Sequence, residues 1–346
     1  MASLVSYLGW GAVAFVLVIA FVLGAVMASF ITCVAYRLMA GESPWKGRSH
    51  CDTCGHTLGA LDLVPILGWV ARGGKCHYCG ARIPVRCVVT EVLLGIVFAL
   101  IVWVFGLGIP ALAYCALATV LLGVSLYDLD TMTIPNGFII ALIAIWTICL
   151  ALCGVCQLAG VPIGLYSQQF AASQLATFGA MGPWVGTGAL SLAMEGLIGA
   201  VVLCAIIFVV CLVFEKITGK VGLGGGDIKL LFACTLYLGF ALGLFNLVVS
   251  CILGIVFFVV GLAKAAPATD DADADAEADA QADAEALETA AADAAAAADD
   301  AADDAAPTPA KGAFPFGPAI AVATIISLFG GIPFVVWYLS LVLGAF

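Results

Sequence analysis

The chain has 346 residues, of which 64% are hydrophobic and only 10% are charged, and its mean hydropathy is +1.18. Because a soluble domain carries roughly 25% charged residues, this composition excludes a soluble globular protein and predicts a polytopic membrane protein. The formal net charge of −11 belongs to one segment: 14 of the 23 acidic residues lie between Asp270 and Asp304. Outside that segment, nine acidic residues are outnumbered by twelve basic ones, which gives a net charge of +3.

The first apolar segment, at about 7–36, contains no Lys or Arg, and none precedes it. A secretory signal peptide has a basic region before its apolar run, so we expect a helix that is retained. The first basic residue, Arg37, follows the segment. This order predicts that the N-terminus lies outside and that the C-terminal end of the helix faces the cytoplasm.

The next segment, 38–87, is polar and contains two Cys-x-x-Cys pairs, Cys51–Cys54 and Cys76–Cys79. Two such pairs separated by about 20 residues are typical of a zinc ribbon. Four thiolates complete the tetrahedron that structural zinc prefers. The alternative is a pair of redox motifs or unliganded thiols, which is less common for matched pairs in a reducing cytoplasm.

The surroundings of these cysteines agree with a metal site. Gly55 and Gly80 each follow a pair directly, as the tight turn of a metal-binding knuckle requires. His50, His56 and His77 are also adjacent, but four cysteines already fill a closed site, so we expect no histidine ligand. The remaining ten cysteines lie in or beside apolar segments, where Cys acts as a small hydrophobic residue; they are Cys33, Cys87, Cys115, Cys149, Cys153, Cys156, Cys204, Cys211, Cys234 and Cys251.

Further apolar segments predict about eight transmembrane helices, since a span needs roughly 20 apolar residues. The expected helices lie at about 7–36, 88–107, 110–127, 137–158, 187–213, 228–241, 244–263 and 315–344. With the N-terminus outside, this arrangement places all twelve basic residues on the cytoplasmic side. The same topology brings the cysteine segment and the two aspartates described next to one membrane face.

Two aspartates lie at the ends of expected helices: Asp128 in YDLDTMTIPN and Asp227 in GLGGGDIKLL. A carboxylate close to hydrocarbon is costly and is usually kept for function. Two carboxyl groups that share one proton can activate water and protonate a scissile carbonyl, as in aspartic proteases. The glycines before Asp227 would let an extended substrate approach closely.

Simpler roles remain open for these aspartates. Asp227 could be a helix cap, and Asp128 or Asp130 could be a turn residue. A membrane transporter or binding protein with a zinc ribbon would also carry intramembrane acids. In a transporter, however, we expect the acids deeper within several helices, whereas these two are at helix ends.

The segment 266–310 is an Ala/Asp-rich run with almost no large apolar side chains. Such a composition favours disorder or a solvated, fluctuating helix. We therefore expect a cytoplasmic insert that takes no part in catalysis.

Five segments in this order resemble the type IV prepilin peptidases, which are bifunctional leader peptidases and N-methyltransferases. They are ASFITCVAYR (28–37), SHCDTCGHTL (49–58), LVPILGWVARGGKCHYCGARIPVRCVVTE (63–91), YDLDTMTIPN (127–136) and GGGDIKLL (224–231). The resemblance places the catalytic pair at Asp128 and Asp227, and not at Asp130. It also matches Arg37 and Glu91, which are our candidates for the cofactor site.

The resemblance implies cleavage of a basic leader after a glycine, followed by methylation of the new N-terminus with S-adenosylmethionine. The family's first-helix motif usually reads GSFLNVxxxR, whereas this chain has Ala28 for Gly and Thr32 for Asn. A peptidase without methyltransferase activity is therefore the alternative. The implied substrates are prepilins or pseudopilins in the lipid bilayer of the bacterial cytoplasmic membrane, and we expect no nucleic-acid partner.

Together these observations predict an all-α polytopic membrane protein with a small cytoplasmic zinc-ribbon-like loop that is built on four cysteines. The expected parts are a first transmembrane helix (1–37), the zinc-binding loop (38–87), a transmembrane aspartic peptidase core (88–263), the acidic insert (264–312) and a last transmembrane helix (313–346).

Overall fold

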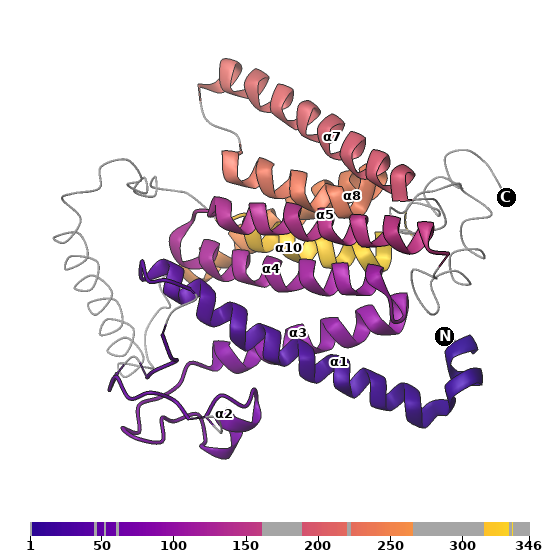
Figure 1. The fold of residues 1–346 in the computed structure, drawn as a ribbon. Helices are drawn as coiled ribbons and strands as arrows, with labels where there is room; N and C mark the ends of the chain where they lie inside the picture. Colours follow the sequence, from indigo (N-terminus) through magenta and orange to yellow (C-terminus); the bar gives the residue numbers. More distant parts are fainter. Residues whose placement is uncertain are drawn as a thin grey trace. The chain divides into compact units, whose positions relative to one another are not determined.

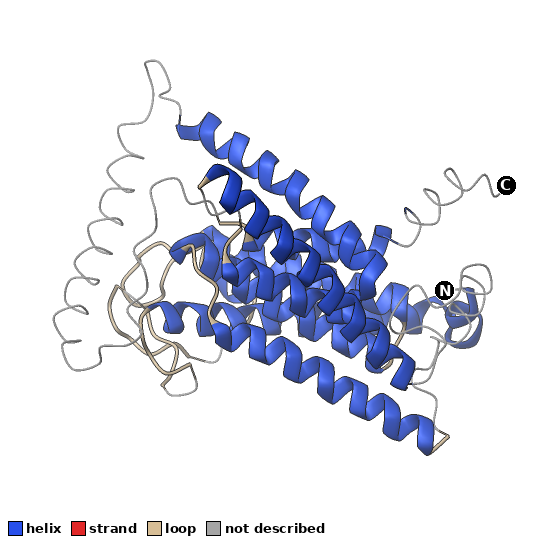
Figure 2. Ribbon diagram, turned by 90° about the horizontal axis from the view of Figure 1, so that it is seen from above, coloured by secondary structure: helices blue, strands red, loops and turns tan. Residues whose placement is uncertain are grey.

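The computed structural model describes residues 2–44, 47–51, 53–59, 62–160, 189–219, 223–265, 315–331 and 334. Within these ranges the secondary structure is helical, without a strand, apart from two isolated antiparallel bridges in the cysteine segment (Figures 1 and 2). The prediction of an all-α protein is thus confirmed. The acidic insert lies outside the described residues, as do 161–188 and most of the chain after 331.

Eight α-helices are described. They are α1 (Ala2–Met39), α2 (Leu67–Ala71), α3 (Val85–Phe105), α4 (Ile109–Thr131), α5 (Asn136–Leu158), α7 (Ala189–Thr218), α8 (Gly225–Ala265) and α10 (Gly317–Ile326), the last continued by a π-helical turn, Ser327–Gly331. Six of them are long and apolar enough to cross a membrane: α1 from Gly9, α3, α4, α5, α7 from Ala193, and α8 up to Val259. The chain is therefore a multi-pass membrane protein.

The difference between six long helices and the eight expected ones arises mainly in α8. Gly239 has φ 73° and ψ 178°, so the helix is interrupted there. A Cβ atom at Gly243 would lie 2.6 Å from Cγ2 of Thr235, which is a contact that a straight helix cannot make across eight residues. The chain therefore folds back at Gly239, and the two arms of α8 correspond to the predicted helices 228–241 and 244–263.

The predicted last helix, 315–344, is described only in part. The α10 helix and its π-helical turn cover Gly317–Gly331, and this apolar helix is shorter than a full span. Two buried side chains dock α10 against the second arm of α8, because Asn246 donates a hydrogen bond from Nδ2 to Oγ1 of Thr324 at 3.1 Å. This contact helps to fix the position of the first residue of α10, which enters the site described below.

The central helix is α4. In its most apolar window 72% of the residues are buried within the protein, against 22–39% for the other five long helices. It packs against α1, α3, α5 and α10. Its start follows Gly106 and Gly108, and it ends where Met132 adopts a left-handed conformation with φ 53°. Pro135 is the N-cap residue of α5 and has an extended conformation with φ −63° and ψ 135°. The residue before a proline is disfavoured in the helical region, so α4 and α5 stay separate. This central helix carries Asp128.

Candidate active site and metal centre

The two predicted catalytic aspartates lie at helix ends that meet. Asp128 is in the last turn of α4, and Asp227 is in the first turn of α8. The charge of Asp128 acts on the carboxyl group of Asp227, so the two groups are within electrostatic range of each other. The structure thus brings together two acids that are about one hundred residues apart in the sequence.

The carboxyl group of Asp128 is enclosed by the start of α10. Asp128 is 3% exposed, and the backbone N–H of Gly317 donates a hydrogen bond to its Oδ2 atom at 2.8 Å. Gly317 is the first residue of α10, so its N–H is one of the unpaired donors at the positive end of a helix. This contact orients the carboxylate and stabilises its negative charge.

The surroundings of Asp227 are set by the glycines before it. Asp227 is the third residue of α8, and it accepts a backbone hydrogen bond from Gly224. A carboxylate at this position commonly reaches back to the N–H of the residue that caps the helix. Asp227 lies within the helix and is thus not itself the N-cap residue considered from the sequence; its hydrogen bond with Gly224 instead holds the side chain at the helix start. A Cβ atom at Gly224 would lie 3.0 Å from Oδ2 of Asp227, so a larger residue there would crowd the acid.

Two contacts hold the start of α8 against the connection between α4 and α5. A Cβ atom at Gly226 would lie 3.3 Å from Cβ of Ile134, so the backbone passes close to that connection. Lys229 donates a hydrogen bond from Nζ to Oδ1 of Asn136 at 3.1 Å. Because Ile134 and Asn136 follow Asp128 closely in the chain, these contacts fix the two acids relative to each other.

Asp130 has a different environment from Asp128. It is exposed and forms a two-point ion pair with Arg86 of α3. Its carboxylate is thus already engaged outside the pair formed by Asp128 and Asp227. This geometry agrees with the choice of Asp128 rather than Asp130 as the first acid.

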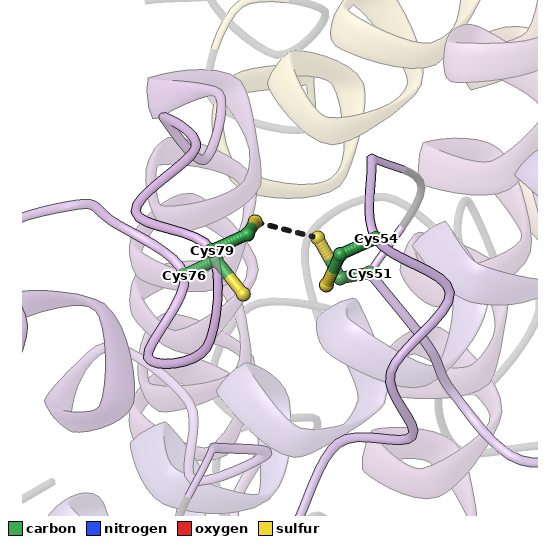
Figure 3. A group of neighbouring side chains, drawn as sticks. All are labelled: Cys51, Cys54, Cys76 and Cys79. Atoms are coloured by element: carbon green, nitrogen blue, oxygen red, sulfur yellow. Dashed lines mark hydrogen bonds between the residues drawn. The ribbon is translucent and has the colours of Figure 1, made fainter.

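The four cysteines of the two Cys-x-x-Cys pairs converge (Figure 3). All four Sγ atoms lie within 4.8 Å of one another, and Sγ of Cys51 is 3.9 Å from Sγ of Cys79. Zinc–sulfur bonds of about 2.3 Å in a tetrahedron place the sulfurs about 3.8 Å apart. The four thiols therefore fit a closed metal site with four sulfur ligands, and the cysteine cluster is compatible with a zinc-ribbon-like loop.

The two halves of this centre have the same backbone conformation. In the first, the N–H of Cys51 bonds to the carbonyl of His56, and in the second the N–H of Cys76 bonds to the carbonyl of Ala81. An antiparallel bridge closes each half, His50 with Thr57 and Lys75 with Arg82. Gly55 and Gly80 have φ values of 67° and 74°, a conformation that favours glycine. The glycines thus form the turns expected from the sequence.

The turns also act on the thiols. Backbone N–H groups, first that of Cys79 and then that of Tyr78, lower the pKa of the Cys76 thiol to about 7. At Cys79 the N–H of Ala81 acts in the same direction, but burial and the neighbouring thiols outweigh it and raise the pKa to about 11. A metal that binds all four sulfurs must therefore release protons, so its affinity should fall as the pH falls.

The neighbouring histidines do not join the cluster of four sulfurs. The ring of His56 stacks on Tyr78 with ring centroids 3.6 Å apart, and His77 meets the same tyrosine edge-on at 5.1 Å. Among the described residues the metal-type cluster consists of the four cysteines. Stacking on Tyr78, which lies inside the second pair, links the two halves of the centre.

Arg37, one of the two candidates for the cofactor site, borders a cavity between α1 and the cysteine segment. The cavity has a volume of about 280 Å³, and Arg37 donates a long hydrogen bond of 3.4 Å to the carbonyl of Pro44 at its rim. Its other lining residues combine polar and apolar groups: Val26, Ser29, Phe30, Cys33, Val34, Pro44, Gly47, Ser49, Leu63 and Pro65. An arginine with hydroxyl groups and an aromatic ring suits a small zwitterionic ligand that carries a flat ring system.

Glu91, the second candidate, does not line this cavity. It is 9% exposed, and its Oε2 atom accepts a hydrogen bond from the N–H of Ile66 at 2.7 Å. Ile66 has φ 62° and ψ −54°, and the N–H of Leu67 bonds to the carbonyl of Pro65 at 2.6 Å. This is a γ-turn of the positive-φ kind, which is rare and strained. Glu91 therefore stabilises the strained turn that follows Pro65 at the cavity wall, and this contact gives it a structural role.

Two of these contacts were not predicted from the sequence. Gly317 contacts Asp128 across 189 residues, and the insert intervenes. The Pro of the Phe-Gly-Pro sequence at 316–318 is typical of a helix start, but this signal does not indicate which group the helix start contacts. The γ-turn at Ile66 has no signal of its own, because a β-branched residue is disfavoured at positive φ.

The arrangement can perform acid–base chemistry on a peptide bond. Two interacting carboxyl groups lie at helix ends, beside the backbone of a glycine-rich segment. They are held by a helix N-terminus and by contacts among α4, α5 and α8. A separate closed thiol site lies on the segment between α1 and α3. The carboxyl pair is therefore the candidate for such chemistry, since four thiolates leave no open metal position for water.

Comparisons with known proteins find family models and relatives that are similar to this chain. The family model of the Bacterial Peptidase A24 N-terminal domain matches residues 22–105, and that of the Type IV leader peptidase family matches residues 115–259. The protein named prepilin leader peptidase/N-methyltransferase of Pseudomonas putida is 27% identical over 263 residues, which are 70% of this chain and 79% of that protein.

Proteins of the same name are similar in two further organisms. The Neisseria gonorrhoeae protein is 26% identical over 270 residues, 71% of this chain and 82% of its own length. The Pseudomonas aeruginosa protein is 26% identical over 282 residues, which are 75% of this chain and 85% of that protein. No solved structure matches the chain. The two adjoining family matches contain the four cysteines and both aspartates, and the chain belongs to the type IV leader peptidase family.

Proposed function

We propose that this protein is a membrane aspartic endopeptidase that removes the leader of type IV prepilins or pseudopilins after a glycine, and then methylates the new N-terminus. The observation that carries the peptidase assignment is the meeting of Asp128 and Asp227 at the ends of α4 and α8. Family membership and the names of the relatives support both activities.

In the proposed cleavage the two carboxyl groups share one proton. The ionised group takes a proton from the attacking water, and the protonated group donates to the oxygen of the scissile carbonyl. The glycines at 224–226 leave room for an extended substrate backbone beside Asp227. The hydrogen bond from Gly317 keeps one carboxylate in place while the substrate enters.

We place the pair at the cytoplasmic side of the bacterial inner membrane, with the N-terminus outside. Tyr36, near the end of α1, contacts Arg86 at the start of α3, and Arg86 pairs with Asp130 near the end of α4. The basic residues from Arg37 to Arg86 lie between the end of α1 and the start of α3. Lys229, at the start of α8, forms a hydrogen bond with Asn136 just after α4. An excess of Lys and Arg marks the cytoplasmic side. A prepilin with its basic leader in the cytoplasm and its apolar helix in the bilayer would present the cleavage site there.

The direct test is incubation of the purified protein with a pilin precursor and labelled S-adenosylmethionine. Leader loss and transfer of label should both occur. Leader loss without label would favour the alternative of a peptidase without methyltransferase activity, for which the departures at Ala28 and Thr32 are the motive. If neither leader loss nor transfer of label occurs, the proposal is contradicted, and a membrane transporter or binding protein remains as the alternative.

Zinc is the metal that we propose for Cys51, Cys54, Cys76 and Cys79, in a structural role. We expect one zinc per chain in the purified protein, measured by elemental analysis. The double variant Cys51→Ser with Cys79→Ser removes one sulfur from each half and should lose the metal. A matched double variant, Cys115→Ser with Cys149→Ser, changes two cysteines outside the cluster and should keep it. Zinc that survives the first variant would contradict the ligand assignment.

S-adenosylmethionine is the methyl donor that we propose, and we infer that it binds in the cavity beside Arg37. Bound there, it would supply an electrophilic methyl group to the amine that cleavage releases. Arg37 can pair with the donor's carboxylate, because a guanidinium presents two parallel N–H groups to a carboxylate. Ser29 and Ser49 offer hydroxyl groups, and Phe30 offers a ring face to an adenine.

Arg37→Met should weaken binding of S-adenosylmethionine by about 10-fold or more, which corresponds to the loss of a charge-assisted pair. The measurement is equilibrium dialysis with labelled donor, independent of any turnover. Arg48→Met is the matched control, because Arg48 is exposed nearby and does not line the cavity. Equal affinities of the two variants would exclude Arg37 from the donor site, and leader cleavage should be unaffected by either change.

A further inference from the structure

Arg86 connects three helices at the end that carries Asp128. It lies in the first turn of α3, and its Nη1 and Nη2 atoms donate to Oδ1 and Oδ2 of Asp130 at 3.1 and 2.5 Å. Its guanidinium carbon is 5.4 Å from the ring centroid of Tyr36 in α1. One side chain from the start of α3 thus contacts both the end of α4 and the last part of α1.

The form of this contact suits positioning more than stability. The side chains of Arg86 and Asp130 are 39% and 30% exposed, and partly exposed ion pairs contribute little to the free energy of folding. A two-point pair nevertheless fixes the direction of both groups, because the planar fork matches the two carboxylate oxygens. The face of the Tyr36 ring further restricts the guanidinium.

The part of the chain that this pair restrains is the last turn of α4. Asp130 follows Asp128 by two residues, and the helix ends when the N–H of Met132 bonds to the carbonyl of Asp128 at 2.8 Å. A rotation or slip of this turn therefore moves the Asp128 carboxyl group away from Gly317 and Asp227. Arg86 also lies seven residues after Cys79, so the pair connects the cysteine segment to the turn that holds Asp128.

We propose that Arg86, through its two-point pair with Asp130, is a positioning residue that holds the Asp128 carboxyl group in register for leader cleavage. The inference rests on the proposed peptidase function. It assigns to the second acid of the Asp-Leu-Asp sequence a role distinct from proton transfer. It also gives the cysteine segment a physical connection to the proteolytic pair.

The test compares Arg86→Met with Arg48→Met in cleavage of a pilin precursor. Arg48 is exposed, lies in the same polar segment that precedes α3 and carries the same charge. Arg86→Met should lower kcat by about 10- to 100-fold, because a displacement of about 1 Å at the reacting groups costs on that order. KM should stay within about twofold, since Arg86 does not touch Asp227 or the glycine-rich segment, while Arg48→Met should leave kcat unchanged.

Charge exchange separates positioning from a general loss of structure. Arg86→Asp and Asp130→Arg should each be slow, and the double variant should recover most of the lost kcat because the pair is restored in reverse. Arg86→Lys keeps the charge but cannot form the two-point pair, and it should have an intermediate kcat. If the methionine variant does not insert or lacks zinc, the lysine variant tests the positioning role in its place. Failure of the wild-type protein to cleave would refute the proposed function itself. A wild-type rate for Arg86→Lys, or a double variant as slow as its slower parent, would overturn the positioning role alone.

Discussion

Replacement of either Asp128 or Asp227 by asparagine should reduce leader cleavage by about 10³-fold, which is the scale of losing general acid–base catalysis. An asparagine cannot exchange a proton, so the remaining acid would have to activate water and protonate the carbonyl alone. The fold should survive, because an asparagine oxygen can still accept the hydrogen bond from Gly317 or Gly224. The measurement is the initial rate of leader loss at saturating precursor, alongside the zinc content and the amount of inserted protein.

Asp130→Asn is the matched control for this experiment. It makes the same chemical change two residues away, on an exposed side chain that is paired with Arg86. Its carboxamide keeps one acceptor for the guanidinium, so cleavage should persist, at a rate reduced by about 10-fold at most. Normal cleavage by Asp128→Asn, or complete loss in Asp130→Asn alone, would show that the wrong acid of this sequence had been chosen.

Local spacing made parts of this structure predictable. The two cysteine pairs are each followed by a glycine. In both halves this glycine has a φ near 70° and closes a tight turn through a backbone hydrogen bond. The apolar segments similarly predict helices of about the right length, because a bilayer requires internally satisfied backbone groups. Even the interruption at Gly239 agrees with a predicted boundary near 242, since a glycine accepts the left-handed conformation at little cost.

Contacts between residues far apart in the sequence could not be predicted from local spacing. Nothing local to Phe316-Gly317-Pro318 indicates that its amide points at Asp128, because that contact depends on how α10 docks against α4 and α8. Glu91 illustrates the same limit: its match to a family motif made it a candidate for the cofactor site, which stays a prediction, and no local pattern indicated that its carboxylate would hold the strained turn at Ile66. Sequence pattern thus proposed candidate residues, and tertiary packing decided which partners position them.

Gly317→Ala tests whether such a packing contact matters for catalysis. A Cβ atom at this position would lie 2.8 Å from Oδ2 of Asp128 and 3.2 Å from its Cβ and Cγ atoms. These distances are too short, and the least costly relief is a rotation of the Asp128 carboxyl group itself. We therefore expect kcat for leader cleavage to fall by about 100-fold, since misplacement of a reacting group by about 1 Å has that effect.

Binding of S-adenosylmethionine and the zinc content should stay normal in Gly317→Ala, because the cavity beside Arg37 and the cysteine cluster do not include Gly317. The control is Gly137→Ala in the first turn of α5, where an added Cβ atom would meet nothing within 4 Å. This control should cleave at the wild-type rate, since alanine is the better helix former and has space. Equal kcat values for the two alanine variants would mean that Asp128 tolerates the displacement, and that the amide of Gly317 does not fix the geometry of the acid pair.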